Sequence, residues 1–141
     1  MELRVIIAGS RDFNDYDVLE DKVDEFFLDF FKHNSDKGFS RIKIISGTAR
    51  GTDRLGERYA EACGYEVVRF PAEWDKLGKR AGVVRNAEMA KYASEGEHCG
   101  VLVVFWDGKS KGTEHMINIA KEYGLQIYFN SIKKQDTFVE K

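Results

Sequence analysis

Short apolar runs rich in β-branched residues alternate with longer stretches of helical periodicity along the chain. The five runs are Arg4–Ala8, Arg41–Ile45, Glu66–Phe70, Val101–Trp106 and Gln126–Phe129. Strands that alternate with helices are joined by right-handed crossovers, so this pattern predicts an α/β fold with a mainly parallel five-stranded sheet. The runs are continuously apolar, which is expected when helices cover both faces of the sheet and make a three-layer sandwich.

The stretches between the runs place apolar residues at the spacing of one buried helix face. Four helices are expected. Their apolar positions are Leu19, Val23, Phe26, Phe27 and Phe30 in the first, Leu55, Tyr59, Ala62 and Cys63 in the second, Val83, Ala87 and Ala90 in the third, and Met116, Ile119, Ala120 and Tyr123 in the fourth. Leu28 and Phe31 fall off the first stripe, which indicates a contact with another subunit or with the C-terminal tail.

The chain has 141 residues, 43% of them apolar, which is enough for one domain with a core. We expect that domain to span residues 1–130, followed by a polar tail at residues 131–141. No apolar run approaches the ~18 residues of a membrane span and no secretory signal is visible, so no membrane partner is expected. Cys63, expected in the core, and Cys99 have neither metal nor disulfide spacing, which favours a cytoplasmic location.

Glycines gather where three of the predicted strands end, together with hydroxyl and cationic residues. In an open parallel sheet these carboxyl ends form the ligand crevice. Glycine allows close backbone approach to an anion, helix N-termini favour negative charge, and arginine offers a planar fork to phosphate. The candidate ligand-binding residues in these loops are Gly9, Ser10, Arg11, Ser46, Gly47, Thr48, Arg50, Gly51, Asp53, Asp107, Gly108, Ser110, Gly112 and Thr113.

Other interpretations of these loops are open. Each loop alone is also compatible with a plain βα turn in which Thr52, Asp53 or Thr113 caps a helix. Neither G-x-x-x-x-G-K-[ST] nor G-x-G-x-x-G is complete, which disfavours ATP hydrolysis and dinucleotide-dependent redox chemistry. The histidines are scattered without metal-ligand spacing, so we expect no metal and no cofactor.

The net charge of −2 is a cancellation between two parts of the chain. Residues 12–29 hold eight acidic residues and one basic residue, a net charge of −7, so the remaining residues carry +5. The basic residues in or beside the glycine loops all lie in that remainder: Arg11, Arg50, Arg54, Arg80, Arg85, Lys109 and Lys111. A locally positive cleft beside an acidic helix is therefore expected, which favours a small phosphorylated ligand over extended nucleic acid.

Two segments of the chain resemble the two halves of the SLOG superfamily. Ser46–Asp53, which reads S-G-T-A-R-G-T-D, is similar to the S-G-x-A-x-G-x-D signature of its Smf/DprA half. Arg85–Met89, followed by a strand and Gly108–Thr113, is similar to the cytokinin-activating LOG half, which carries R-K-x-x-M, a strand and P-G-G-x-G-T-x-x-E. Ile7–Arg11 and Arg80–Asn86 are closest to the small YspA-like branch, a group without an assigned reaction.

The resemblance covers roughly residues 3–130 and implies a Rossmann-like domain. It implies a nucleotide or nucleotide-derived ligand over Gly9, Gly47 and Gly112, with contacts from Arg85 and Asn86. Members of the superfamily commonly self-associate, so a homo-oligomer, either a dimer or a tetramer, is expected.

The catalytic part of the LOG pattern is incomplete. LOG enzymes cleave the N-glycosidic bond of a nucleoside monophosphate with the motif's arginine and final glutamate. Arg85 matches the arginine, but Met116 stands at the glutamate position and Glu114 lies two residues early, about 200° around the helix. The candidate catalytic residues are therefore Arg85, Glu88 and Glu114, with Asp53 as a further carboxylate for acid–base work.

These observations favour a binding protein, that is, a sensor, carrier or sequestering protein for a nucleotide-like ligand. One alternative is a LOG-type nucleotide N-glycosidase or phosphoribohydrolase, and a further one is DprA-like binding of single-stranded DNA. Trp106, and less so Trp74, are candidates to stack on a base. The segment Glu73–Gly82 has the composition either of a cover over an anion or of a solvated loop.

Overall fold

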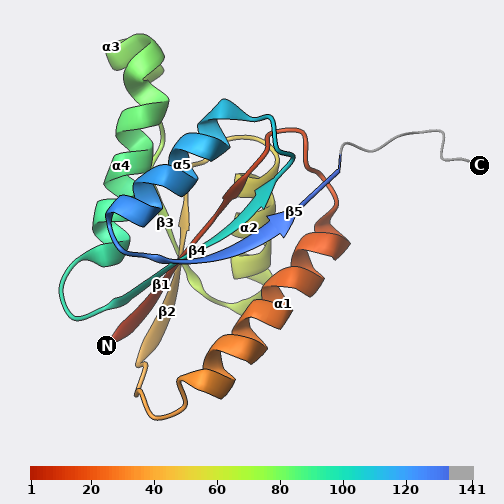
Figure 1. The fold of residues 1–141 in the computed structure, drawn as a ribbon, viewed down its shortest axis with the longest axis vertical. Helices are drawn as coiled ribbons and strands as arrows, with labels where there is room; N and C mark the ends of the chain where they lie inside the picture. Colours follow the sequence, from red (N-terminus) through yellow and green to blue (C-terminus); the bar gives the residue numbers. More distant parts are fainter. Residues whose placement is uncertain (134–141) are drawn as a thin grey trace, which may run out of the picture.

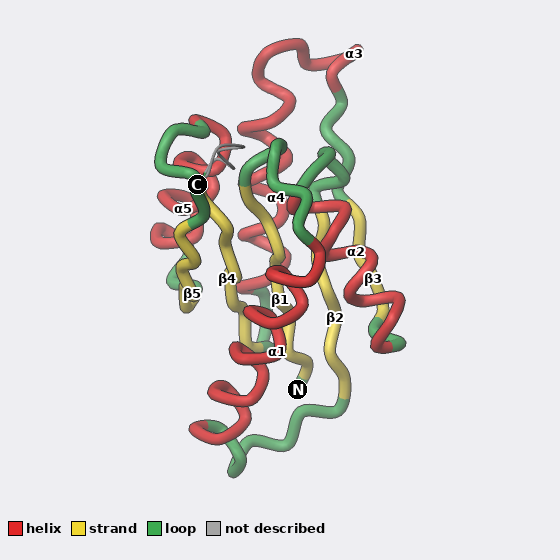
Figure 2. The backbone as a smooth tube through the Cα atoms, turned by 90° about the vertical axis from the view of Figure 1, so that its right-hand side faces the viewer, coloured by secondary structure: helices red, strands yellow, loops and turns green. Residues whose placement is uncertain are grey.

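All five predicted strands are present in one parallel sheet. The structure, a computed structural model, describes residues 1–133. The strands are β1 (Glu2–Gly9), β2 (Arg41–Ser46), β3 (Glu66–Arg69), β4 (Cys99–Trp106) and β5 (Gln126–Ser131). They lie side by side in the order β3-β2-β1-β4-β5 (Figure 2), and every neighbouring pair is parallel. The sheet grows in opposite directions from β1 and β4, so their carboxyl ends form the topological switch point.

Helices cover both faces of the sheet and complete three layers (Figure 1). The helices are α1 (Tyr16–His33), α2 (Thr52–Cys63), the short α3 (Trp74–Leu77), the 3-10 turn η1 (Gly78–Arg80), α4 (Ala81–Ser94) and α5 (Lys111–Glu122). Helices α1 and α2 pack on one face, and α4 and α5 pack on the other. The predicted Rossmann-like α/β sandwich is confirmed. None of the helices within residues 1–133 combines the length and apolar character needed to cross a membrane.

The α1 stripe is buried as predicted, and its extra aromatic residue has a partner within the chain. Phe31 packs against Phe27, with ring centroids 6.0 Å apart, and against Phe39, 6.1 Å away. This contact explains the position of Phe31 without a second subunit. Leu28 is 75% exposed.

The buried faces of the other helices differ from the prediction. Cys63 and Ala62 are exposed, because Gly56 lets α2 lie close to Ile7 and a different stripe of α2 faces the sheet. Val83 is half exposed. The buried residues are Thr52, Asp53, Gly56, Tyr59 and Ala60 in α2, Ala81, Arg85, Asn86, Met89, Ala90 and Ala93 in α4, and Thr113, Met116, Ile117 and Ala120 in α5. Tyr59, Ala90, Met116 and Ala120 are buried as predicted, whereas apolar spacing missed the polar side chains that share each face.

The predicted boundary of the tail also shifts slightly. Strand β5 continues to Ser131, one residue into the stretch expected to be a polar tail, and pairs there with Trp106 of β4. The rest of that prediction, from residue 134 onward, lies outside the described residues.

Candidate functional site

Gly9 and Ser10 hold the ends of β1 and β4 together. A Cβ at Gly9 would overlap the carbonyl oxygen of Phe105, so only glycine permits this approach. The Ser10 N–H donates to the same carbonyl at 2.9 Å, and its Oγ accepts from the N–H of Asp107 at 3.2 Å. The Ser10 carbonyl accepts from Oγ1 of Thr52 at 2.9 Å, which ties the start of α2 to the same point.

The loop after β2 folds back onto the first turns of α2. Ser46 Oγ donates to Glu57 Oε2 at 2.6 Å and accepts from the N–H of Thr48 at 3.0 Å. Thr48 has a φ of 64°, a left-handed conformation that β-branched residues rarely adopt. Asp53 Oδ2 accepts from the N–H of Ala49 at 3.1 Å. Ser46 and Asp53 are buried, so these polar residues of the motif fix the shape of the loop.

Two buried polar side chains of α4 connect the loops after β2 and β4. Arg85 donates from Nη1 to the Gly47 carbonyl at 2.6 Å and from Nε to Asn86 Oδ1 at 3.0 Å. Asn86 Nδ2 donates to the Gly112 carbonyl at 3.3 Å and lies 3.1 Å from His115 Nδ1. The Arg85–Asn86 pair therefore aligns the loop after β2 with the first turn of α5.

The loop after β4 is shaped by Asp107. Its Oδ1 accepts from the N–H groups of Lys109, at 2.8 Å, and Ser110, at 2.9 Å, and these bonds lower the pKa of the Asp107 carboxyl. Ser110 caps α5, because its Oγ accepts from the N–H of Thr113 at 3.3 Å. Trp106 Nε1 donates to the Ser110 carbonyl at 3.0 Å. Trp106 thus supports this loop by a hydrogen bond, and its side chain does not line the cavity that opens between the loops after β1, β2 and β4.

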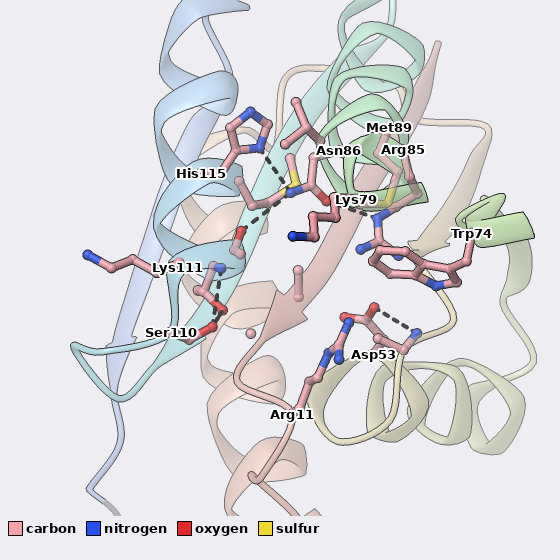
Figure 3. A pocket seen from close by; sticks show the side chains of 18 residues that line it. Arg11, Asp53, Trp74, Lys79, Arg85, Asn86, Met89, Ser110, Lys111 and His115 are labelled. Carbon is pink, nitrogen blue, oxygen red and sulfur yellow. Dashed lines mark hydrogen bonds between the residues drawn. The ribbon is translucent and has the colours of Figure 1, made fainter. Parts of the chain in front are cut away.

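A cavity of about 290 Å³ opens between these loops on the side of α4 and α5 (Figure 3). It brings together eight predicted ligand-binding residues from four separate segments of the chain. They are Gly9, Arg11, Asp53, Arg85, Asn86, Ser110, Gly112 and Thr113. An adjoining hollow of about 360 Å³ contains Gly47, Thr48 and Arg50 and shares Arg11 and Arg85 with the cavity.

Ser10 and Asp107 face the opposite side of β1. There they line a second cavity of about 500 Å³, beneath the start of α1, together with Phe13, Val18 and Lys109. Ser46, Gly51 and Gly108 contribute to neither cavity wall. The loops predicted to share one crevice therefore divide between two sides of the switch point.

The two glutamates considered for catalysis lie outside the cavity. Glu88 is exposed on α4, where Arg85, Asn86 and Met89 face inward. Glu114 is exposed on α5, with its Oε1 4.0 Å from Lys111 Nζ. Met116, which stands at the position of the LOG glutamate, lines the cavity.

Sequence reasoning gave too little weight to three residues on the cavity wall. Trp74 and Lys79, from the segment considered as a possible cover, both line it, and so does His115. The signal was the aromatic and cationic composition of residues 73–82. Within residues 1–133, no three His, Cys, Asp or Glu side chains gather as metal ligands would.

Burial shifts the pKa values of Asp53 and Arg85, which both line the cavity. Burial raises the pKa of Asp53 to about 6, although the hydrogen bond from the Ala49 N–H and the charge of Arg85 act to lower this pKa. Burial also lowers the pKa of the Arg85 guanidinium, against the opposing effect of Asp53, but arginine keeps its charge at neutral pH. Near neutral pH the cavity therefore presents a fixed cation beside a carboxyl group able to bind a proton.

A parallel sheet with a switch-point cavity between glycine loops defines a Rossmann-like α/β protein. Within that class, the chain belongs to the YAcAr family, the YspA, cpYpsA-related SLOG family, whose sequence profile matches residues 3–77. The chain is similar to the Gene 61 protein of Mycobacterium phage D29, with 32% identity over 133 residues, covering 88% of this chain and 93% of the phage protein. No solved structure matches it. The predicted SLOG resemblance and its YspA-like branch are confirmed.

Proposed function

We propose that this protein binds a nucleotide or nucleotide-derived small molecule in the cavity between α4 and α5, as a sensor, carrier or sequestering protein. Membership of the SLOG family supports a nucleotide-related ligand in general. The observation that carries the proposal is the buried guanidinium of Arg85. It is oriented by Gly47 and Asn86 and lines a cavity that also contains the first turn of α5.

The electrostatics of the cavity suit a phosphate group. The first N–H groups of a helix lack partners within the helix, and its dipole favours an anion there, so Lys111 and Gly112 of the 12-residue α5 offer backbone donors. Arg11, Lys79 and Lys111 add positive charge to the same wall. Ligand pockets usually have volumes of about 300–1,000 Å³, and the cavity with its adjoining hollow falls in this range.

A thermal-shift screen with nucleoside mono- and diphosphates, ADP-ribose and cyclic dinucleotides tests the proposal. A ligand at 100 times its dissociation constant should raise the free energy of unfolding by about 2.7 kcal/mol. Arg85→Met should weaken binding of any hit about 100-fold, because it removes charge-assisted hydrogen bonds to the phosphate. Arg41→Met, at the opposite end of the sheet, is the matched control and should bind as the wild type does.

The proposal fails if no phosphate-bearing compound shifts the midpoint, or if Arg85→Met binds a hit as tightly as the wild type. A single-stranded oligonucleotide in the same screen tests the DNA-binding alternative. Strong binding that weakens steeply with salt would favour that alternative.

The position of Asp53 favours a second candidate function, a LOG-type nucleotide N-glycosidase or phosphoribohydrolase. Asp53 lines the cavity with Arg85, whereas Glu88 and Glu114 lie outside it. Arg85 would hold the phosphate, and Asp53, with a pKa of about 6, would give a proton to the leaving base while a water molecule bonds to the sugar carbon C1′ and loses its proton to solvent. Release of free base or ribose phosphate that is lost in Asp53→Asn would support this candidate. Intact nucleotide after incubation with the wild type would contradict this candidate and leave ligand binding as the only proposed function.

The family resemblance also leads us to expect a homo-oligomer, a dimer or a tetramer. Leu28, 75% exposed, and Phe129, 53% exposed, are apolar side chains open to such a contact. Light scattering during size-exclusion chromatography measures the mass directly, and a mass of one chain would contradict this expectation.

A further inference from the structure

Trp74 is a large aromatic residue that is 49% exposed and yet lines the proposed ligand cavity. It lies in the short α3, on a wall that the cavity shares with the adjoining hollow. Figure 3 shows its indole ring next to Arg85 on one side and Asp53 and Arg11 on the other. An apolar ring left open at this place has a face available for a ligand.

One edge of this ring lies near the first turn of α4. Gly82 carries no side chain, and a Cβ at that position would lie 3.5 Å from Cη2 of Trp74 and 3.8 Å from Nη2 of Arg85. The indole edge therefore faces Gly82, on the helix that also carries Arg85. A ligand phosphate on Arg85 would bring the rest of the ligand near the indole.

Arg11 lies over the same indole ring from the opposite side of the cavity. Its guanidinium carbon is 6.0 Å from the ring centroid, and the Arg11 side chain is exposed. A planar ring between two flat groups needs about 7–8 Å between them, because carbon atoms in contact lie about 3.5–4.0 Å apart. An outward movement of Arg11 by about 1–2 Å would therefore admit one planar ring.

We propose that Trp74 and Arg11 hold the base of the ligand between them and so select nucleotides over sugar phosphates that lack a base. This inference rests on the proposed function and assigns the specificity to Trp74, which lies outside the segments that carry the family resemblance, together with Arg11. Aromatic rings and guanidinium planes are the two kinds of surface on which proteins stack bases. The phosphate would lie at Arg85 and the start of α5, and the base at the cavity mouth.

Isothermal titration of the full chain with AMP, UMP and ribose 5-phosphate tests this inference. Trp74→Leu should weaken binding of the two nucleotides about 5- to 150-fold, the range for loss of base–aromatic stacking, and change ribose 5-phosphate less than twofold. Trp74→Phe keeps an aromatic face and should recover most of the loss. Tyr123→Leu, an exposed aromatic residue just after α5, is the control and should change nothing. The nucleotides should also quench Trp74 fluorescence, and ribose 5-phosphate should not.

The outcomes separate this inference from the function on which it rests. If Trp74→Leu weakens nucleotides and ribose 5-phosphate equally, or weakens neither, the base does not stack on Trp74, and nucleotide binding itself stands. If none of the three compounds binds to the wild type, the proposed function fails and this inference fails with it.

Discussion

The two ends of the sheet each contain a buried arginine, and the two arginines have different partners. Arg4, near the amino end of β1, has its Nε 3.0 Å from Glu2 Oε1, donates from Nη1 to the Tyr92 carbonyl at 2.7 Å, and stacks on the Tyr92 ring at 4.0 Å. Arg85, near the carboxyl ends, donates only to neutral oxygens, at Gly47 and Asn86. Among residues 1–133 no carboxylate forms an ion pair with Arg85.

The carboxyl groups beside the two arginines, half-buried Glu2 and buried Asp53, differ in the same way. Burial alone would raise the pKa of Glu2, but hydrogen bonds from Arg4 and Lys43 bring it below its ordinary value of 4.5. Burial dominates at Asp53 and raises its pKa. The amino end is thus electrostatically satisfied within the chain, which stabilises the fold. The carboxyl end holds a cation and a carboxyl group without full compensation, as expected where an external anion binds.

The largest predicted effect separates the two arginines by stability. Arg4→Met should lower the free energy of unfolding by about 2–4 kcal/mol, because it removes the buried guanidinium's contacts with half-buried Glu2, with the Tyr92 carbonyl and with the Tyr92 ring. Arg85→Met should change it by about 1 kcal/mol or less, since losing two hydrogen bonds to neutral oxygens is offset by no longer burying a charge. Urea unfolding of both variants measures this. Equal losses of unfolding free energy in Arg4→Met and Arg85→Met would contradict the distinction between the two arginines.

The second prediction contrasts the two carboxyl groups by pH. The pKa of Asp53 is raised from 3.8 to about 6 on folding, so the folded state binds more protons in this window and stability falls as pH rises through it. Asp53→Asn should therefore be more stable than the wild type at pH 7–8, by on the order of 3 kcal/mol at most, with the difference vanishing below about pH 4.

Glu2→Gln should behave in the opposite sense. The pKa of Glu2 is lowered on folding, so its contribution to stability is present above pH 4.5 and is lost as pH falls. This variant should therefore be less stable than the wild type at pH 7. Unfolding curves at several pH values measure the free energy of unfolding of Asp53→Asn and Glu2→Gln. A change of the same sign in both variants at pH 7 would contradict the difference between the two carboxyl groups.

The smallest predicted effect concerns the contact that orients Arg85. A Cβ at Gly47 would lie 2.8 Å from Arg85 Nη1 and 2.9 Å from Asp53 Oδ2, so Gly47→Ala should displace the guanidinium from the Gly47 carbonyl. AMP affinity should fall about tenfold, the effect of one hydrogen bond from a charged group. Gly38→Ala, where a Cβ meets nothing within 4 Å, is the titration control. Unchanged affinity in Gly47→Ala would show that Arg85 needs no such orientation.

Hydrophobic periodicity predicted the sheet and its parallel strands, and the glycine loops predicted part of the cavity wall. Gly9 ends β1, Gly47 follows β2 and Gly112 lies in the first turn of α5, all at the edge to which parallel strands bring their carboxyl ends. Helix faces were less predictable where polar residues are buried. Arg85 and Asn86 lie on the inner face of α4, and apolar spacing alone pointed to Val83 instead.

The side of the switch point on which a loop residue lies could not be predicted from spacing. Ser10 faces away from the cavity because its N–H and Oγ bond to the end of β4, a contact between residues about 95 positions apart. The positions of the two tryptophans relative to the cavity could not be predicted for a similar reason. Trp106 bonds to the Ser110 carbonyl behind the loop, and Trp74 reaches the cavity through the chain reversal that follows β3.

The central claim is that a nucleotide binds on the α4–α5 side of the switch point, and an amide NMR titration with AMP tests it most directly. The account predicts saturable shifts at Gly47–Ala49 and Gly112–Thr113, which are abolished in Arg85→Met. Shifts confined to Phe13, Val18 and Ile132, which line the cavity under α1, would contradict it.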